Sequence, residues 1–75
     1  MKSGELYKNV WQSVRIYRDI LSQEVIGYVD TGSVFLLLEL PPEYQAYPDF
    51  FAKIMCKEQV GWIHYDRVFC EKIST

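Results

Sequence analysis

The stretch Val60-Gly61-Trp62-Ile63, near the end of this 75-residue chain, limits the possible folds more than any other. Its glycine stands inside a pattern of apolar residues that is typical of a β-strand. Such a glycine marks a bulge, a bend or the close approach of another backbone, because no Cβ stands in the way. The indole beside it either covers a core or forms the floor of a groove. Together with a similar stretch at residues 25–29, this stretch predicts a small β-barrel.

From Glu24 onward the sequence predicts β-strands separated by turns. Val25-Ile26-Gly27-Tyr28-Val29 is a short apolar stretch, and Asp30-Thr31-Gly32 has the composition of a turn, since glycine tolerates the positive φ that tight turns require. Residues 33–40 follow, with apolar side chains at both odd and even positions. This pattern predicts a strand that is covered on both faces.

A loop with three prolines, residues 41–49, separates this strand from the next one. Proline withholds a backbone donor, so no central strand can run through the loop. Two further strands are predicted at Phe50–Cys56 and Val60–Ile63. They are joined by a short charged turn, so we expect them to pair as an antiparallel hairpin. Residues 69–73 predict a last strand that closes the sheet.

The N-terminal residues 5–21 fit two structures. One is a helix, because apolar residues recur every three or four positions. The residues of this helical face are Leu6, Val10, Val14, Tyr17 and Leu21. The other is a strand at Val14–Tyr17, where the side chains alternate and β-branched residues occur. Periodicity alone leaves both structures open.

The length and composition indicate one ordered domain, residues 1–75. Hydrophobic residues make up 49% of the chain and aromatic residues 16%, whereas disordered chains have low hydrophobicity and high net charge. The net charge of −2 gives no general attraction to nucleic acid or to anionic membranes. No apolar run has the length of a signal peptide or a membrane span. We therefore expect a cytoplasmic protein with no membrane association.

Three pieces of the chain resemble the bacterial SH3 domain. They are Val14-Arg15, then residues 25–34, and then Val60-Gly61-Trp62-Ile63. The family has a Val-Arg pair near the first strand, an Ile-Gly-x-Leu/Val followed by a turn ending in glycine, and a Gly-Trp-Val/Ile near the end. The resemblance implies an all-β fold, a small SH3-like barrel of five or six antiparallel strands with a short 3₁₀ turn at His64 to Arg67. It places the core of the domain at about residues 10–72. It also favours a strand at Val14 over the helix.

The resemblance extends to eukaryotic SH3 domains, which bind proline-rich peptides in an aromatic groove. A tryptophan opening the third strand and a proline and a tyrosine of the 3₁₀ turn help to form that groove. In this chain Phe50-Phe51, His64 and Arg67 stand at those positions. The resemblance therefore implies a module for protein interaction or for targeting to cell-wall peptides, and it argues against a reader of polyproline.

Aromatic side chains are the candidate binding residues. Partly exposed tyrosine and tryptophan side chains are common anchors of interfaces. The groove implied by an SH3-like barrel is lined by Tyr17, Tyr47, Phe51, Trp62 and Tyr65. The alternative is that these rings close the open end of the barrel. Other aromatic side chains are expected to pack in the core, namely Phe35, Phe50 and Phe69.

No catalytic, metal or cofactor site is predicted. His64 is the one histidine, expected in a surface turn, and no nucleophile and orienting group accompany it in the sequence. The carboxylates are scattered and show no EF-hand spacing. Cys56 and Cys70 are expected to be unlinked thiols.

The sequence as a whole predicts a non-enzymatic module that binds a protein or peptide through its aromatic groove. We expect an accessory or regulatory protein of bacterial or phage origin. One alternative is a small barrel associated with nucleic acid, against which the absence of a basic run in the sequence argues. Another is a targeting module for cell-wall peptides. The partner's identity and the oligomeric state stay open.

Overall fold

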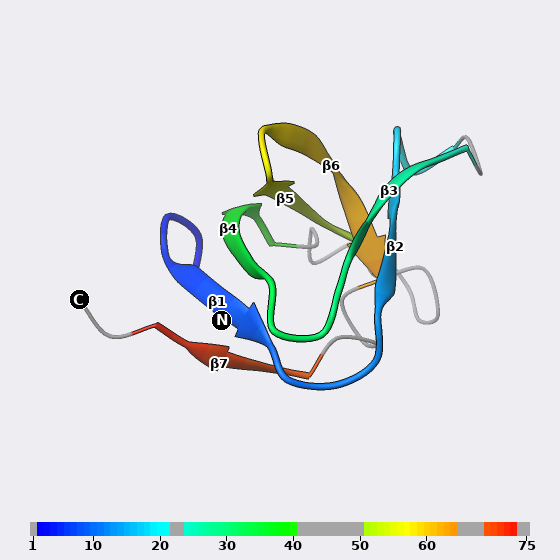
Figure 1. Cartoon of the computed structure of the whole chain (residues 1–75). Coiled ribbons are helices and arrows are strands. Elements are labelled where there is room, and N and C mark those ends of the chain that lie inside the picture. Colours follow the sequence, from blue (N-terminus) through cyan, green and yellow to red (C-terminus); the bar gives the residue numbers. More distant parts are fainter. Residues whose placement is uncertain (1, 22–23, 41–50, 65–68, 74–75) are drawn as a thin grey trace.

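The fold consists of antiparallel β-strands (Figure 1). The computed structural model describes residues 2–21, 24–40, 51–64 and 69–73, and none of these lies in a helix. The strands are β1 (Leu6–Asn9), β2 (Val14–Tyr17), β3 (Val25–Val29), β4 (Val34–Glu39), β5 (Phe51–Cys56), β6 (Gln59–His64) and β7 (Cys70–Lys72). The predicted all-β class is confirmed. The seven strands exceed the five or six expected, because residues 6–9 form a strand of their own.

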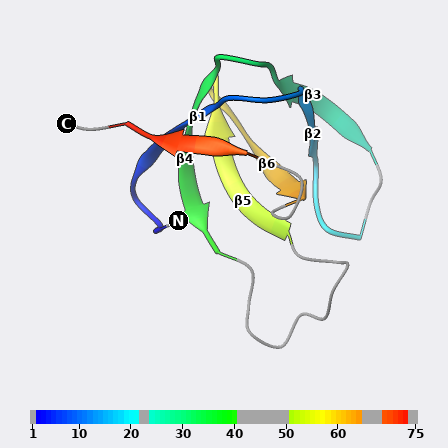
Figure 2. The ribbon, with the colours of Figure 1, turned by 90° about the horizontal axis from the view of Figure 1, so that it is seen from below.

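All seven strands belong to one sheet with the order β3-β2-β6-β5-β4-β1-β7. Strands β4, β5 and β6 form a meander, and β1 lies between β4 and β7. The hairpin β2–β3 is added at the far side of β6 (Figure 2). Over the described residues β3 and β7 are the two edges of the sheet, so the sheet is not closed.

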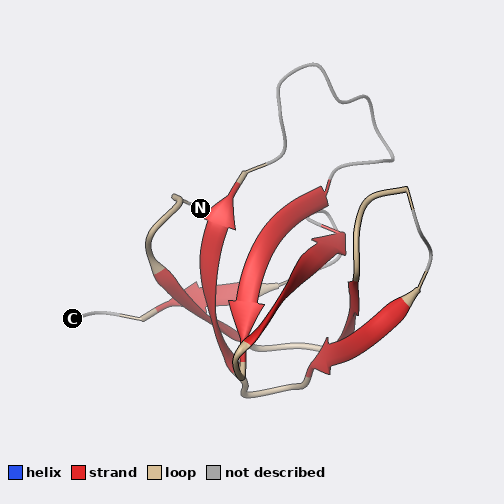
Figure 3. Ribbon diagram, turned by 90° about the horizontal axis from the view of Figure 1, so that it is seen from above, coloured by secondary structure: helices blue, strands red, loops and turns tan. Residues whose placement is uncertain are grey.

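One hydrophobic core lies against the inner face of this sheet. Strands β1 to β6 each contribute at least one buried side chain to it. The core residues are Tyr7, Val14, Ile16, Val29, Phe35, Leu37, Ala52, Ile54, Cys56 and Ile63. A single sheet can gather side chains from six strands only by curling around them, and the curvature is visible in Figure 3. Side chains that alternate with the core residues therefore point outward.

The N-terminal residues correct two expectations. The helix considered for residues 5–21 is absent, because this part of the chain forms the strands β1 and β2. The core begins before residue 10, because Tyr7 and Asn9 are buried in β1. A strand of four residues at the N-terminus carries little local signal, and it forms here because β4 and β7 pair with it on both sides.

Strand β4 is fully buried on one face only and partly buried on the other, whereas its apolar residues predicted cover on both faces. Phe35 and Leu37 are buried, whereas Val34 is 44% exposed and Leu36 and Leu38 are half-buried. The reason is that the core fills one face of a single sheet. Among the described residues no second layer lies on the outer face, so apolar side chains there stay partly in contact with solvent.

Two predicted turns and the predicted hairpin are confirmed. Gly32 has a φ of +87°, and the amide of Ser33 donates to the carbonyl of Asp30 at 2.9 Å. Strands β5 and β6 pair along their whole length, for example at Ile54 and Gly61. The last predicted strand is present as β7. The predicted 3₁₀ turn lies outside the described residues except for His64, which belongs to β6.

The turn between β5 and β6 offers a way to stabilise the protein. Lys57 and Glu58 both have positive φ, 51° and 67°, which is the backbone of a two-residue turn that favours Asn-Gly. Replacing the pair by Asn-Gly is expected to raise the free energy of unfolding by about 1 kcal/mol. The exposed contact from Lys57 to Asp30 at 3.8 Å contributes little, so its loss matters little. Urea denaturation measures the change, and an unchanged or lower stability contradicts the expectation.

The described residues contain no helix of the length and hydrophobicity that a membrane span requires.

Candidate functional site

Three of the five predicted groove residues lie on the outer face of the sheet. Tyr17 is in β2, Phe51 in β5 and Trp62 in β6, and each is half-buried. Their neighbours in the chain point into the core, as the alternation in a strand requires. Tyr47 and Tyr65 lie outside the described residues. The structure therefore places three of the five residues predicted to line a groove.

Tyr17, Phe51 and His64 form an aromatic cluster on this face. Phe51 and His64 are register partners in β5 and β6, and their ring centroids are 4.5 Å apart. The ring of Tyr17 meets both edge-on, with centroid distances of 6.1 Å to Phe51 and 5.5 Å to His64. Such edge-to-face contacts add to the stabilisation from burial. His64 was expected in a surface turn, and the structure corrects this because the residue is half-buried in a strand between two rings.

Trp62 lies beside this cluster rather than within it. It is the register partner of Tyr17 on one side and of Lys53 on the other. The ammonium group of Lys53 is 5.9 Å from the centre of the indole ring, at the outer limit of a cation–π contact. The stem of Lys53 thus borders the indole, and Trp62 is less accessible to a ligand than its position on the outer face suggests.

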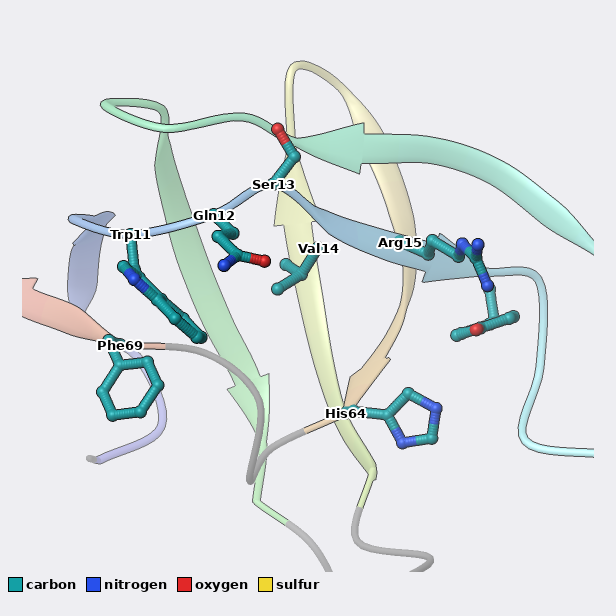
Figure 4. A pocket seen from close by; sticks show the side chains of 8 residues that line it. Trp11, Gln12, Ser13, Val14, Arg15, His64 and Phe69 are labelled. Atoms are coloured by element: carbon teal, nitrogen blue, oxygen red, sulfur yellow. The ribbon is translucent and has the colours of Figure 1, made fainter.

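A pocket of about 420 Å³ opens on the other side of Tyr17 and His64. It lies between the segment after β1, strand β2, the end of β6 and the start of β7. Its lining consists of Trp11, Gln12, Ser13, Val14, Arg15, Tyr17, His64 and Phe69. Figure 4 shows Trp11 and Phe69 at one end of the pocket and Arg15 with His64 at the other. Pockets of this size accept a few side chains of a peptide or a small molecule.

The sequence analysis missed Trp11 and misjudged Phe69. Trp11 is 49% exposed, and Phe69, which was expected to pack in the core, is 56% exposed. Their rings meet at right angles, with centroids 4.8 Å apart. The sequence does indicate that Trp11 is exposed. It is followed by two polar residues, Gln12 and Ser13, and belongs neither to the helical face nor to the strand considered for residues 5–21. No local signal identifies the partnership with Phe69, which lies at the other end of the chain.

Asn9 positions the segment that carries Trp11. Its side chain is fully buried, and its amide nitrogen donates to the carbonyls of Val29 and Gln12, both at 2.9 Å. Its side-chain oxygen accepts the amide hydrogen of Trp11 at 3.1 Å. The hydroxyl of Thr31 donates to the carbonyl of Trp11 from the opposite side. One wall of the pocket is thereby held in place before any ligand binds.

Phe69 is attached to the same wall. The amide of Val10 donates to the Phe69 carbonyl at 2.9 Å, which continues the pairing of β1 with β7. Each of the two exposed rings therefore extends from a residue whose backbone is held by hydrogen bonds. Aromatic anchors on fixed backbone lose little conformational entropy when they bind.

The described residues contain no group of three or more His, Cys, Asp or Glu side chains that could hold a metal ion. Cys56 is buried and Cys70 is half-buried, and the two thiols are not joined in a disulfide, as expected. Burial raises the pKa of both thiols, which keeps them protonated and weakly nucleophilic at neutral pH. The described lining of the pocket thus offers ring surfaces, hydrogen-bonding groups and one guanidinium group.

No protein-family model, no curated protein and no solved structure matches the chain. The resemblance to bacterial SH3 domains therefore stays a prediction.

Proposed function

We propose that this chain is a non-enzymatic module of the SH3-like type that binds a peptide segment of a partner protein in an aromatic groove. The pocket beside Tyr17 is the observation that carries the proposal. It combines a concave surface with two half-exposed aromatic side chains, Trp11 and Phe69, on backbone that is already ordered. Large exposed aromatic side chains around a pocket are characteristic of binding sites, because their burial by a partner is strongly favourable.

The strand arrangement supports the SH3-like barrel as the fold of this module. A three-stranded meander is flanked by the N-terminal strand β1, which in turn pairs with the C-terminal strand β7. The sheet curls around one core, and a hairpin, β2–β3, extends it at β6. Arrangements of this kind are typical of small barrels with a binding groove between connecting segments.

The groove of this proposal runs from the pocket over the aromatic cluster. Tyr17 and His64 belong to the pocket and to the aromatic cluster. Phe51 contacts these two rings on the side away from the pocket. The two surfaces are thus continuous. Compared with the sequence prediction, the proposed groove is shifted toward β7, with Trp11 and Phe69 as anchors at one end and Trp62 at its border.

Selection from a random peptide display library tests the proposed function. We expect the immobilised protein to enrich peptides that bind it in solution. The change Trp11→Ala is expected to weaken their binding by more than about 2 kcal/mol, because an interface anchor is lost. Titration calorimetry measures the affinities. The fold of this variant is expected to survive, since about half of the indole surface is exposed to solvent in the free protein.

Val60→Ala is the matched control for Trp11→Ala. Val60 is also a half-exposed apolar residue, but it lies at the start of β6, whereas the pocket is at the end of that strand. Its replacement is expected to leave the affinities unchanged. If Trp11→Ala enriches and binds the same peptides as well as the unchanged protein does, the pocket is not the binding site. The same follows if Trp11→Ala and Val60→Ala lose affinity equally.

A further inference from the structure

Arg15 gives the pocket a positive charge, whereas the protein as a whole carries a net negative charge. It is the one residue, among the described residues that line the pocket, with a permanent formal charge. The chain carries a net charge of −2, so this pocket is locally positive on an acidic protein. Arg15 itself is exposed and points outward from β2, on the same face as Tyr17 two residues further on.

Two tyrosines flank the guanidinium-bearing side chain. Tyr17 neighbours Arg15 along the strand, and Tyr28 is its register partner across the hairpin β2–β3. Tyr28 is 53% exposed. Directly opposed side chains of two antiparallel strands lie within contact distance of each other, so the two tyrosine rings border the arginine stem. The guanidinium stays accessible to a ligand, since Arg15 is exposed.

The neighbouring carboxylates are engaged with other groups. Glu24 binds Arg18, with 2.6 Å between oxygen and nitrogen. Asp30 accepts from the hydroxyl of Ser13 at 3.1 Å and lies 3.8 Å from the ammonium group of Lys57. Within the described part of the chain, no carboxylate forms an ion pair with Arg15. The charge of Arg15 is therefore not neutralised by these groups.

We infer that the pocket selects peptide segments in which an aspartate or glutamate follows or precedes an apolar side chain. The carboxylate binds the guanidinium of Arg15, and the apolar side chain lies against Trp11 and Phe69 at the other end of the pocket. Arginine binds a carboxylate through two parallel N–H···O bonds, which adds directional specificity to the charge attraction. This inference rests on the proposed function, and it names the class of partner: acidic peptide segments.

Parallel selections from one random peptide display library test this inference. The baits are the unchanged protein, Arg15→Gln and Arg18→Gln. The last variant is the matched control, because Arg18 follows the same strand but is paired with Glu24 and does not line the pocket. We expect acidic residues at one fixed position of the peptides enriched by the unchanged protein and by Arg18→Gln. The peptides enriched by Arg15→Gln are expected to lack this preference.

A double-mutant cycle measures the pair directly. An enriched peptide is compared with its analogue in which the acidic residue is replaced by its amide. The unchanged protein is expected to bind the amide peptide about tenfold more weakly, whereas Arg15→Gln binds both peptides equally. Added sodium chloride is expected to weaken binding of the acidic peptide to the unchanged protein and to have less effect on Arg15→Gln.

The outcomes separate the inference from the proposed function. If peptides are enriched and lose affinity with Trp11→Ala, yet show no acidic position and bind Arg15→Gln equally well, the pocket binds peptides and the inference about Arg15 is wrong. If no peptide is enriched, or Trp11→Ala has no effect, the proposed function itself fails and the inference with it.

Discussion

Replacing Gly61 by alanine is expected to lower the free energy of unfolding by about 3 kcal/mol, the upper range for overpacking in a core. A Cβ at this position would stand 2.4 Å from Cγ2 of Ile16 and 2.7 Å from the backbone oxygen of Tyr17. Ile16 is fully buried and cannot turn away, and a backbone oxygen moves only with its strand. Strand β2 would therefore have to move away from β6. Urea or thermal denaturation measures the loss.

Gly27→Ala is the control for this expectation. Its Cβ would come even closer to a neighbour, 2.3 Å from Oε1 of Gln59, but that atom is the end of a flexible and exposed side chain. Gln59 can move away and give up its hydrogen bond of 3.0 Å to the carbonyl of Ile26. We expect a loss of no more than about 1 kcal/mol. Similar losses of stability in both variants would contradict the expectation that the close contact of β2 and β6 at Gly61 leaves no room for a Cβ.

The Gly61 variant also affects the proposed binding site. Strand β2 meets β6 at the register pair Tyr17 and Trp62, directly beside Gly61. A displacement of β2 separates Tyr17 from His64 and changes the shape of the pocket that both residues line. Any Gly61→Ala protein that still folds is therefore expected to bind selected peptides more weakly than Gly27→Ala does.

Replacing Asn9 by alanine is expected to cost about 3 kcal/mol of stability. The change removes three hydrogen bonds and leaves the carbonyls of Val29 and Gln12 and the amide of Trp11 without this partner. A buried polar group that loses its partner costs about 1–3 kcal/mol. The loss is below the sum of three such terms because water can reach the partly buried groups near Trp11 once the side chain is gone. Chemical denaturation gives the value.

Asn9→Asp separates the donor role of this side chain from its shape. The carboxyl group still accepts the amide hydrogen of Trp11, but when ionised it faces the carbonyl oxygens of Val29 and Gln12 with no donor. We expect it to destabilise the fold at least as much as alanine at neutral pH, since an unpaired charge is buried. Ser13→Ala, which loses one exposed hydrogen bond of 3.1 Å to Asp30, is expected to change stability by less than about 0.5 kcal/mol. An Asn9→Asp protein as stable as the unchanged one would show that the donated bonds are unimportant.

Much of the fold was predictable from local chemistry in the sequence. The hairpin predicted from Phe50–Cys56 and Val60–Ile63 is present as β5 and β6. Gly32 occupies a turn position with positive φ. The cover of β4 was predicted only in part: Leu36 and Leu38 on its outer face are half-buried rather than fully buried, because hydrophobicity does not say which face a neighbour covers.

The candidate site was predictable only in part. Tyr17, Phe51 and Trp62 do share one face, because the parity of each strand follows from its core residues. The pocket was not predictable, since Trp11 and Phe69 meet only through the pairing of β1 with β7. Asn9 gave no signal either, because a buried asparagine cannot be distinguished in sequence from one in an exposed turn.

The sequence by itself indicated where the chain turns, where most of the strands lie, and that Gly61 marks a bulge, a bend or a close backbone contact. These properties depend on a few neighbouring residues, whose sterics and hydrophobicity act locally. The tertiary structure alone decided that residues 6–9 form a strand, and that Trp11, Arg15, His64 and Phe69 border one pocket. Such decisions depend on strand pairing between distant segments, and the register of a pairing is set by the packing of the whole core.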